Sequence, residues 1–443
     1  MADTETPCCS FCGAAKSPTL PLIAGNEGCI CEACVNLAHQ VVSSWGQRRK
    51  LQQLAPQLRT PAEYKRHLDE SVIGQEAAKE TLSVAVYNHY LRLLNCDREP
   101  FCQLGEQVEL EKSNILMAGP SGTGKTLLVR TLARILGVPF ASADATTLTQ
   151  AGYVGDDVDS IIARLLEAAG GDVQQAQWGI VYIDEVDKLA RRSGGGTAVR
   201  DISGEGVQQA LLKMVEGTEV RIAKSGRRSE HSEEQVVDTR NILFIAGGAF
   251  PGLEELVRGR LQPRSGGIGF HAQPPRQEKA SINQLLAALL PDDLHEFGLI
   301  PEFIGRFPII TFLQELDHAT LLRILSEPRN ALVKQYKQLF AYQGVKLEIS
   351  AAALGHIADQ ALIRRTGARG LRAVLEAALQ QTMFDMPSLP RLRTCTLDLV
   401  ADGEGERLTV CQTLAEEGEV KVADGEAAAS DAQAAPSRAA LDL

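Results

Sequence analysis

Residues 119–126 read Gly119-Pro120-Ser121-Gly122-Thr123-Gly124-Lys125-Thr126, and this octapeptide carries the strongest structural signal in the chain. It fits G-x-x-x-x-G-K-[ST], the pattern of a phosphate-binding loop. The glycines let the backbone turn tightly, so that successive N–H groups point at a polyphosphate. The N-terminus of the following helix adds a partial positive charge. We expect Lys125 to reach the β- and γ-phosphates of ATP or GTP, and Thr126 to ligate Mg²⁺.

The octapeptide lies between the elements that such a loop needs. Asn114–Ala118 is a short apolar run that predicts a buried strand, and Leu127–Ala133 predicts a helix. Two further apolar runs, Gly179–Ile183 and Asn241–Ala246, predict other strands. Strands that alternate with amphipathic helices are typical of an α/β domain with a parallel sheet. The alternative, a chance match in a glycine-rich turn, is disfavoured by this strand–loop–helix setting.

The composition restricts the class of protein. The chain has 443 residues and a net charge of −11, which argues against a general nucleic-acid or anionic-membrane binder. It shows no apolar stretch long enough for a signal peptide or a membrane span. We therefore expect a cytoplasmic protein with reduced cysteines and with neither a membrane nor a nucleic-acid partner.

The cysteines gather at the N-terminus, where six of the 10 precede residue 35. Cys9 and Cys12 form one C-x2-C pair, Cys31 and Cys34 form another, and eighteen residues separate the pairs. This spacing predicts a structural Zn²⁺ site of four thiolates, whose metal would supply folding energy to a segment too short for a core. Free thiols in a flexible tail are the alternative.

Two features of this module leave questions open. Cys8 and Cys29 could replace one of the four ligands, although they break the paired spacing. A four-cysteine module can bind nucleic acid or protein. Lys16 is the only Lys or Arg before Arg48, so we favour a protein partner.

A second ATPase motif follows the loop by about sixty residues. The apolar run Gly179–Ile183 ends in Asp184 and Glu185, which is the Walker B form. The carboxyl end of a parallel strand places such acids beside a P-loop. We expect Asp184 to organise Mg²⁺ and Glu185 to orient and activate the attacking water. A solvated acidic turn is the alternative, and the upstream P-loop disfavours it.

Two arginines are candidates for the charge that phosphoryl transfer develops. Arg306 follows the segment 298–305, and Arg369 opens a helix in the C-terminal part of the chain. A guanidinium can neutralise that charge. Taken alone, each arginine fits a surface ion pair equally well.

The chain divides by composition into five parts. We expect a zinc-binding domain, a polar linker, a large α/β domain, a small helical domain and an acidic disordered tail, at residues 1–46, 47–61, 62–313, 314–413 and 414–443. Loops are expected at Arg191–Arg200, Arg221–Asp238 and Arg264–Ala280. In the small domain we expect helices at Leu321–Leu325 and Leu371–Gln381, and strands near Thr396–Val400 and Arg407–Val410.

From the zinc module to about residue 413 the chain resembles the ClpX family of AAA+ protein unfoldases. The resemblance rests on family-specific stretches in matching order: Val72-Ile73-Gly74-Gln75, Asp144–Thr149, Ala151–Gly155, Asp201–Leu212, Gly298–Arg306 and Thr366–Arg372. It implies an AAA+ P-loop NTPase large domain with a parallel sheet, a mainly helical small domain and a preceding four-cysteine zinc domain.

The resemblance also implies residue roles at the nucleotide. Val72 and Ile73 would pack on the adenine. Arg306 would be an arginine finger that reaches the ATP of a neighbouring subunit, and Arg369 would be the sensor-2 arginine. A finger that acts in trans requires an oligomer, and the family forms a homohexameric ring with a head-to-tail interface.

Two loops match the family's contacts with proteins. Tyr153 and Val154 match the pore-loop pair that grips a polypeptide, and Ile268-Gly269-Phe270 matches the tripeptide that docks into the peptidase ClpP. An aromatic and a branched side chain can grip any chain without reading its sequence. An exposed apolar anchor suits a pocket on a partner. A surface turn with one buried Tyr, or a loop that folds its own apolar residues inward, would be the alternative without the resemblance.

Two features depart from the family pattern. Ser225–Ser229 lies where the family usually has Arg-Lys-His, and His231 follows two positions later. The positive charge is kept, but substrate preference is open. The acidic extension after residue 413 has no counterpart in the family pattern.

We therefore expect an ATPase with ATP, Mg²⁺ and Zn²⁺ as cofactors that unfolds proteins and threads them through a hexamer pore into ClpP. The zinc module would recruit adaptors or substrates, and cleavage would belong to ClpP. A first alternative is a ClpP-independent ATP-driven chaperone or remodeller, which Ile268-Gly269-Phe270 disfavours as a sole role. A nucleic-acid motor or zinc-dependent regulator is disfavoured by the net charge of −11.

Overall fold

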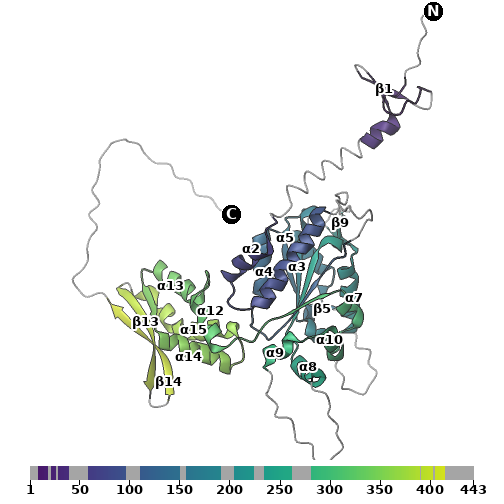
Figure 1. The fold of residues 1–443 in the computed structure, drawn as a ribbon. Coiled ribbons are helices and arrows are strands. Elements are labelled where there is room, and N and C mark those ends of the chain that lie inside the picture. The colour runs from purple at the N-terminus through teal and green to yellow at the C-terminus, as the bar shows by residue number, and fades with distance from the viewer. Residues whose placement is uncertain are drawn as a thin grey trace, which may run out of the picture. The chain divides into compact units, whose positions relative to one another are not determined.

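The computed structural model describes residues 8–17, 21–25, 28–38, 58–95, 110–149, 156–190, 204–223, 234–261, 281–389, 391–402 and 405–414 (Figure 1). The chain forms two compact units. The first holds residues through Leu332 together with Gly355–Leu375, and the second holds Val333–Leu354 together with residues from Glu376 onward. The domain boundaries expected from composition stay predictions.

The N-terminal module is built from two short strands and a helical segment. Strand β1 (Leu22–Ala24) pairs antiparallel with β2 (Cys29–Cys31), and residues 32–38 are helical. The first cysteine pair lies on a turn, because the N–H of Gly13 donates to the carbonyl of Cys9 at 2.8 Å. The N–H of Ser10 donates to the carbonyl of Cys29 at 2.7 Å and fixes this turn to β2.

The centre of the first unit is a five-stranded sheet whose strand pairs are all parallel, in the order β11-β3-β10-β7-β4. The strands are β3 (Ile115–Ala118), β4 (Phe140–Asp144), β7 (Ile180–Asp184), β10 (Leu243–Gly248) and β11 (Ile309–Phe312). The parallel α/β sheet is thus confirmed. The three expected strands are β3, β7 and β10, with ends shifted by one or two residues.

Both faces of the sheet are buried. Since side chains alternate along each strand, neighbouring residues of one strand belong to different cores. Ile115 and Met117 belong to one core, and Leu116 and Ala118 belong to the other. The first core is covered by α2 (Pro61–Asp69), α3 (Glu76–Asn95) and α4 (Lys125–Leu136). The second is covered by α5 (Ser160–Ala168), α7 (Glu205–Glu216), α8 (Leu253–Leu261), α9 (Ile282–Ala287), α10 (Pro291–Phe297) and α11 (Pro301–Gly305).

Short elements connect these layers. They are η1 (Ala145–Thr147), β5 (Leu148–Thr149), β6 (Asp156–Asp157), α6 (Val173–Ala176), η2 (Val186–Leu189) and η3 (Thr239–Asn241). Helix α2 begins at Pro61, the last residue of the expected linker. Thr60 caps the helix, because its side chain accepts from the N–H of Glu63 while the Glu63 carboxylate accepts from the N–H of Thr60.

One loop expectation was wrong. The expected loop Arg221–Asp238 contains parts of two paired strands, β8 (Glu219–Ala223) and β9 (Glu234–Asp238). The physical reason is that Val220 and Val237 face each other in register and are both buried, which outweighs the polar residues around them. The expected loops Arg191–Arg200 and Arg264–Ala280 lie outside the described residues.

The C-terminal part combines helices with a three-stranded sheet, in the order β12-β13-β14. Its elements are α12 (His318–Ser326), α13 (Leu332–Tyr342), β12 (Lys346–Ile349), α14 (Ala351–Ile363), α15 (Ala368–Asp385), η4 (Met386–Ser388), β13 (Leu392–Asp402) and β14 (Gly405–Leu414). The expected helices correspond to α12 and α15, and the expected strands to β13 and β14. Each observed element is longer than expected.

Candidate functional site

The P-loop joins β3 to α4, as the sequence predicts. Gly124 is the N-cap of α4 with a φ of 100°, a left-handed conformation that favours glycine. Gly122 has a φ of 77°, and a Cβ placed there would collide with the carbonyl oxygen of Thr366. The two glycines are therefore needed for different reasons, one for the turn into the helix and one for a close approach to another segment.

Lys125 is nearly buried at the first turn of α4. Its Nζ donates to the carbonyl oxygens of Gly119 at 2.6 Å and Pro120 at 3.0 Å. Burial lowers the pKa of Lys125 to about 8, an effect that the charges of Asp184 and Asp187 oppose. An anion beside Nζ would stabilise the charged form more than these neutral carbonyls do.

Asp184 ends β7 and faces the P-loop. Its Oδ2 accepts a hydrogen bond from the hydroxyl of Thr126 at 3.1 Å, and its Oδ1 accepts one from the N–H of Glu185 at 3.0 Å. Glu185 has a φ of 57°, an uncommon conformation for a residue with a side chain. The predicted P-loop and Walker B acids are thus brought together at the carboxyl edge of the sheet.

A cavity of about 630 Å³ lies over these groups. Its walls include residues of both motifs, an acid from η2 and an arginine from α15: Lys125, Thr126, Asp184, Glu185, Asp187 and Arg369. A concave site of this size, with convergent charged groups, is suited to a small polyanionic ligand.

The segment that precedes α15 is in direct contact with the P-loop. The N–H of Ala368 donates to the carbonyl of Gly122 at 3.1 Å, and Nη1 of Arg369 donates to the hydroxyl of Ser121 at 3.4 Å. Gly367 has a φ of 56°, and a Cβ there would lie 2.9 Å from the carbonyl oxygen of Ser121. Two backbones approach closely here because both segments carry glycine at the contact.

Val72 and Ile73 are both buried. Among the described residues that line the cavity, the connection between α2 and α3 contributes Ser71 and neither of these two. Gln75 fastens this connection, since its Nε2 donates to the carbonyl of Gln314 at 2.9 Å and its Oε1 accepts from the N–H of Gln314 at 2.7 Å. The connection is therefore tied to the chain that leaves β11.

Arg306 lies away from the cavity. Its Nη2 is 2.6 Å from Oε1 of Glu216 on α7, and its side chain is 54% exposed. Arg306 precedes β11, which runs parallel to β3 and pairs with it from Ile309–Ile115 onward. It thus lies at the amino edge of the sheet, whereas the P-loop leaves the carboxyl edge.

Sequence reasoning missed Asp187. This side chain is buried in η2 and lines the cavity, and its Oδ1 accepts from the N–H of Ala249 at 3.1 Å. Its Oδ2 lies 3.5 Å from Nζ of Lys188. The sequence offers one signal, an acid two residues after Glu185, but this does not distinguish a buried acid from a solvated one.

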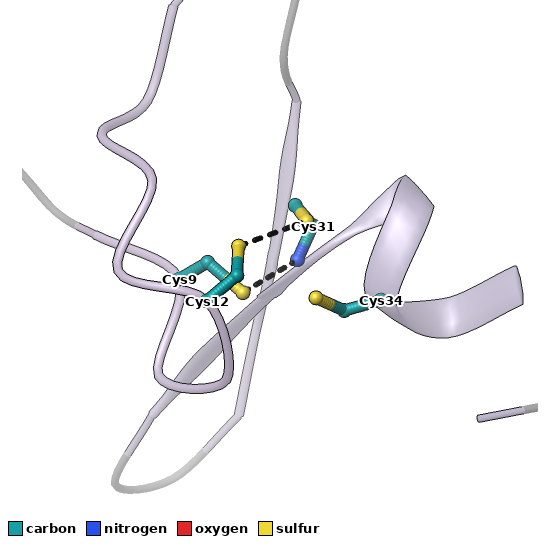
Figure 2. Close-up of side chains that lie close together, drawn as sticks. All are labelled: Cys9, Cys12, Cys31 and Cys34. Carbon is teal, nitrogen blue, oxygen red and sulfur yellow. Dashed lines mark hydrogen bonds between the residues drawn. The ribbon is translucent and has the colours of Figure 1, made fainter. Parts of the chain in front are cut away.

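The four expected cysteine ligands form one cluster, which Figure 2 shows. The sulfurs of Cys9, Cys12, Cys31 and Cys34 all lie within 4.8 Å of one another. Cys9 and Cys12 come from the turn before β1, Cys31 ends β2, and Cys34 lies in the helical segment. Cys8 and Cys29, the alternative ligands, do not belong to this cluster.

The donor chemistry of the cluster fits Zn²⁺. The backbone N–H of Cys12 holds the pKa of Cys9 at about 6, and the N–H of Cys31 donates to the Cys9 sulfur at 3.3 Å. Hydrogen bonding to the sulfurs of Cys31 and Cys12 raises the pKa of Cys34 to about 12. A divalent cation favours the deprotonated form of every thiol that it ligates.

Some expected functional residues lie outside the described residues. They are the pore-loop pair Tyr153 and Val154, the docking tripeptide Ile268-Gly269-Phe270, and the segment Ser225–Ser229 with His231. Among the helices that the structure does describe, none is long and apolar enough to cross a membrane.

Three family models match separate parts of the chain. The AAA domain (Cdc48 subfamily) matches residues 110–310, and the ClpX C4-type zinc finger matches residues 7–44. The C-terminal D2-small domain of ClpB protein matches residues 316–395. The matches follow the order of the cysteine cluster, the parallel sheet and the C-terminal helices.

Two curated relatives align with nearly the whole chain. The ATP-dependent Clp protease ATP-binding subunit ClpX of Azotobacter vinelandii is 86% identical over 423 residues, which cover 95% of this chain and 96% of the relative. The ATP-dependent Clp protease ATP-binding subunit ClpX 3 of Methylococcus capsulatus is 56% identical over 428 residues, which cover 95% of this chain and 98% of the relative.

Proposed function

Because the chain belongs to the ClpX family of AAA+ ATPases and is therefore an ATP-dependent protein unfoldase, we propose that it threads its substrates through a homohexameric pore into ClpP. The chain is an ATPase that uses ATP and Mg²⁺, and its zinc finger takes Zn²⁺. The relatives are named as subunits of a protease, which supports a peptidase partner. The observation that carries the proposal is the convergence of P-loop, Walker B acids and Arg369 on one cavity.

We assign the phosphate contacts to the P-loop. The backbone N–H groups of residues 119–126 and the ammonium of Lys125 would hold the polyphosphate. Thr126 and Asp184 would hold Mg²⁺, which when bound neutralises charge on the phosphates. Glu185 would orient and activate water, since it lies beside Asp184 in the cavity wall.

Three further residues complete this assignment. Val72 and Ile73 would pack on the adenine, and their position directly after Ser71, which lines the cavity, supports an apolar contact there. Arg369 would sense the nucleotide, since it donates to Ser121 within the P-loop. A change at the phosphates would thereby reach α15 through the contact between Ala368 and Gly122.

Arg306 would act on the ATP of a neighbouring subunit. The position of Arg306 at the amino edge of the sheet supports this role, because the P-loop of the same chain leaves the opposite edge. An exposed arginine on one face and a cavity on another suit a head-to-tail ring, for which we propose six subunits.

We propose Cys9, Cys12, Cys31 and Cys34 as the Zn²⁺ ligands, and the zinc domain as the recruiter of adaptors or substrates. The domain division proposed is zinc domain, linker, AAA+ large domain, AAA+ small domain and acidic tail, at residues 1–46, 47–61, 62–313, 314–413 and 414–443. Tyr153 and Val154 would grip substrate, Ile268-Gly269-Phe270 would dock into ClpP, and the protein would work in the cytoplasm.

The proposal is tested by ATP-dependent degradation of a tagged folded substrate, with and without ClpP. We expect unfolding in both reactions and peptide products only with ClpP. Phe270→Ala should keep unfolding and lose degradation, because the apolar anchor is gone. Degradation that persists in this variant would refute the docking assignment. Unfolding without any effect of ClpP would favour an independent remodeller.

A further inference from the structure

Tyr182 lies two residues before Asp184 on β7, and neither the P-loop pattern nor the Walker B pattern gives it a role. Side chains alternate along a strand, so the two residues project from the same face of the sheet. The Tyr182 ring is fully buried, and its hydroxyl donates to Oδ1 of Asp184 at 3.1 Å. The spacing of two residues along the strand thus places the Tyr182 hydroxyl next to the Asp184 carboxylate.

The neighbouring strand makes room for this phenol. Gly247 lies on β10, which pairs with β7, and a Cβ there would overlap the hydroxyl of Tyr182. A residue with any side chain at this position would displace the ring. The contact between Tyr182 and Asp184 is therefore built into the sheet by the sequence of two strands.

The Asp184 carboxylate is held at both oxygens. Oδ1 accepts from the Tyr182 hydroxyl and from the N–H of Glu185, while Oδ2 accepts from the hydroxyl of Thr126. Two donors behind Oδ1 leave the carboxylate little freedom to rotate. Oδ2 is then the oxygen that faces the P-loop.

Tyr182 remains a donor at working pH. A tyrosine hydroxyl ordinarily has a pKa of about 10, so the phenol is protonated near neutral pH and can donate. A hydrogen bond to a charged carboxylate is shorter and stronger than one between two neutral groups, so it holds the orientation of the carboxylate more firmly.

We propose that Tyr182 is a positioning residue for Mg²⁺, because its hydroxyl fixes the orientation of the Asp184 carboxylate that would hold the ion. The inference rests on the role proposed above for Asp184. Groups that orient a metal ligand change metal affinity by about 10–100-fold when they are removed. Tyr182→Phe deletes one oxygen and keeps the ring that fills the core.

The test measures Mn²⁺ binding to the full chain by electron paramagnetic resonance, with a non-hydrolysable ATP analogue present. We expect Tyr182→Phe to weaken Mn²⁺ binding by about tenfold. Affinity for the analogue without metal should stay within about twofold, since the P-loop is untouched. Tyr90→Phe is the matched control, because the Tyr90 hydroxyl is also buried but donates to the carbonyl of Trp178 at 2.8 Å.

The variant Asp184→Asn distinguishes a wrong role for Tyr182 from a wrong role for Asp184. If Asp184→Asn weakens Mn²⁺ binding but Tyr182→Phe behaves like Tyr90→Phe, the role of Tyr182 is wrong and that of Asp184 stands. If Asp184→Asn binds Mn²⁺ like the unmodified chain, both roles are wrong. Equal losses in Tyr182→Phe and Tyr90→Phe would indicate general destabilisation and overturn the inference.

Discussion

The hydroxyl of Thr126 donates to Oδ2 of Asp184 at 3.1 Å, and this bond joins two motifs that lie 58 positions apart in the chain. Thr126 follows β3 and Asp184 ends β7, with β10 between the two strands. The parallel direction of all three strands brings both residues to the same edge. The residues that would bind phosphate and those that would act in hydrolysis are therefore held by strands of the same sheet.

Glu185 should be needed for hydrolysis but not for binding. We expect Glu185→Gln to keep ATP affinity within about twofold and to lower turnover by at least about a hundredfold, because the amide cannot accept a proton from water. Isothermal titration and a phosphate-release assay measure the two effects. Glu255→Gln, at an exposed position on α8, is the matched control for loss of one negative charge. Normal turnover in Glu185→Gln would contradict the role.

The sequence predicted the P-loop and the strands with continuous apolar runs. Ile115–Ala118 and Ile180–Asp184 were found within about one residue, because a strand buried on both faces needs an unbroken apolar run. Strands β4 and β11 were missed. Phe140–Asp144 contains small and polar residues, and Ile309–Phe312 is interrupted by Thr311, so neither gives a continuous apolar run.

Contacts between distant segments could not be predicted from local pattern. The docking of Thr366–Arg369 on Gly122 depends on two backbones that meet across more than 240 positions. Glycine at both contact points is a signal only after the contact is known. The same holds for Tyr182, whose apolar neighbours indicate a strand and conceal the hydrogen bond to Asp184.

ATP affinity should fall above pH 8 because of Lys125. Burial lowers the pKa of this lysine to about 8, and a bound polyphosphate would raise it. Affinity is then complete below pH 8 and is lost as pH rises toward the pKa of the bound state, by up to about tenfold per pH unit. Phosphate groups have a second pKa of about 6, so their own titration is essentially complete above pH 8.

Titration calorimetry between pH 7 and pH 9.5, in buffers with different ionisation enthalpies, measures both the affinity and the proton uptake. Lys125→Arg is the control, because its guanidinium stays charged and its affinity should not depend on pH in this range. The effect of Lys125 on the free energy of unfolding depends on pH in the opposite direction. Since the unfolded chain binds more protons between pH 8 and 10.5, this lysine makes the free energy of unfolding rise with pH. If the ATP affinity of the unmodified chain did not change with pH over this range, the phosphate contact assigned to Lys125 would be refuted.

Cys9→Ser should abolish stoichiometric zinc binding. The four sulfurs lie within 4.8 Å of one another, and a hydroxyl is a far poorer ligand for Zn²⁺ than a thiolate. Zinc content is measured by mass spectrometry of the metal after dialysis. Cys8→Ser is the matched control, since Cys8 is adjacent and exposed but does not belong to the cluster. One zinc per chain in Cys9→Ser would show that the ligand set is different.

Arg306 should act on a neighbouring subunit, and subunit mixing can detect this. Arg306→Ala should lower ATPase activity by about a thousandfold, as expected for an arginine finger. Its effect on stability should be small, because the ion pair with Glu216 is exposed and such pairs contribute about 0–1 kcal/mol. Lys125→Ala should be inactive for a different reason, since it removes the phosphate contact of its own site.

Mixing the two inactive variants should restore activity. A site formed by the P-loop of an Arg306→Ala subunit and the finger of a Lys125→Ala subunit is complete, and random 1:1 mixing in a head-to-tail ring gives about one such site in four. A mixture of Lys125→Ala with Glu185→Gln is the control, because each of these subunits carries the defect in its own ATP site, whichever neighbour it meets. Co-purification of two tags establishes that subunits exchange. With exchange established, a mixture no more active than its parts would place Arg306 in its own subunit's site, against its position at the opposite edge of the sheet.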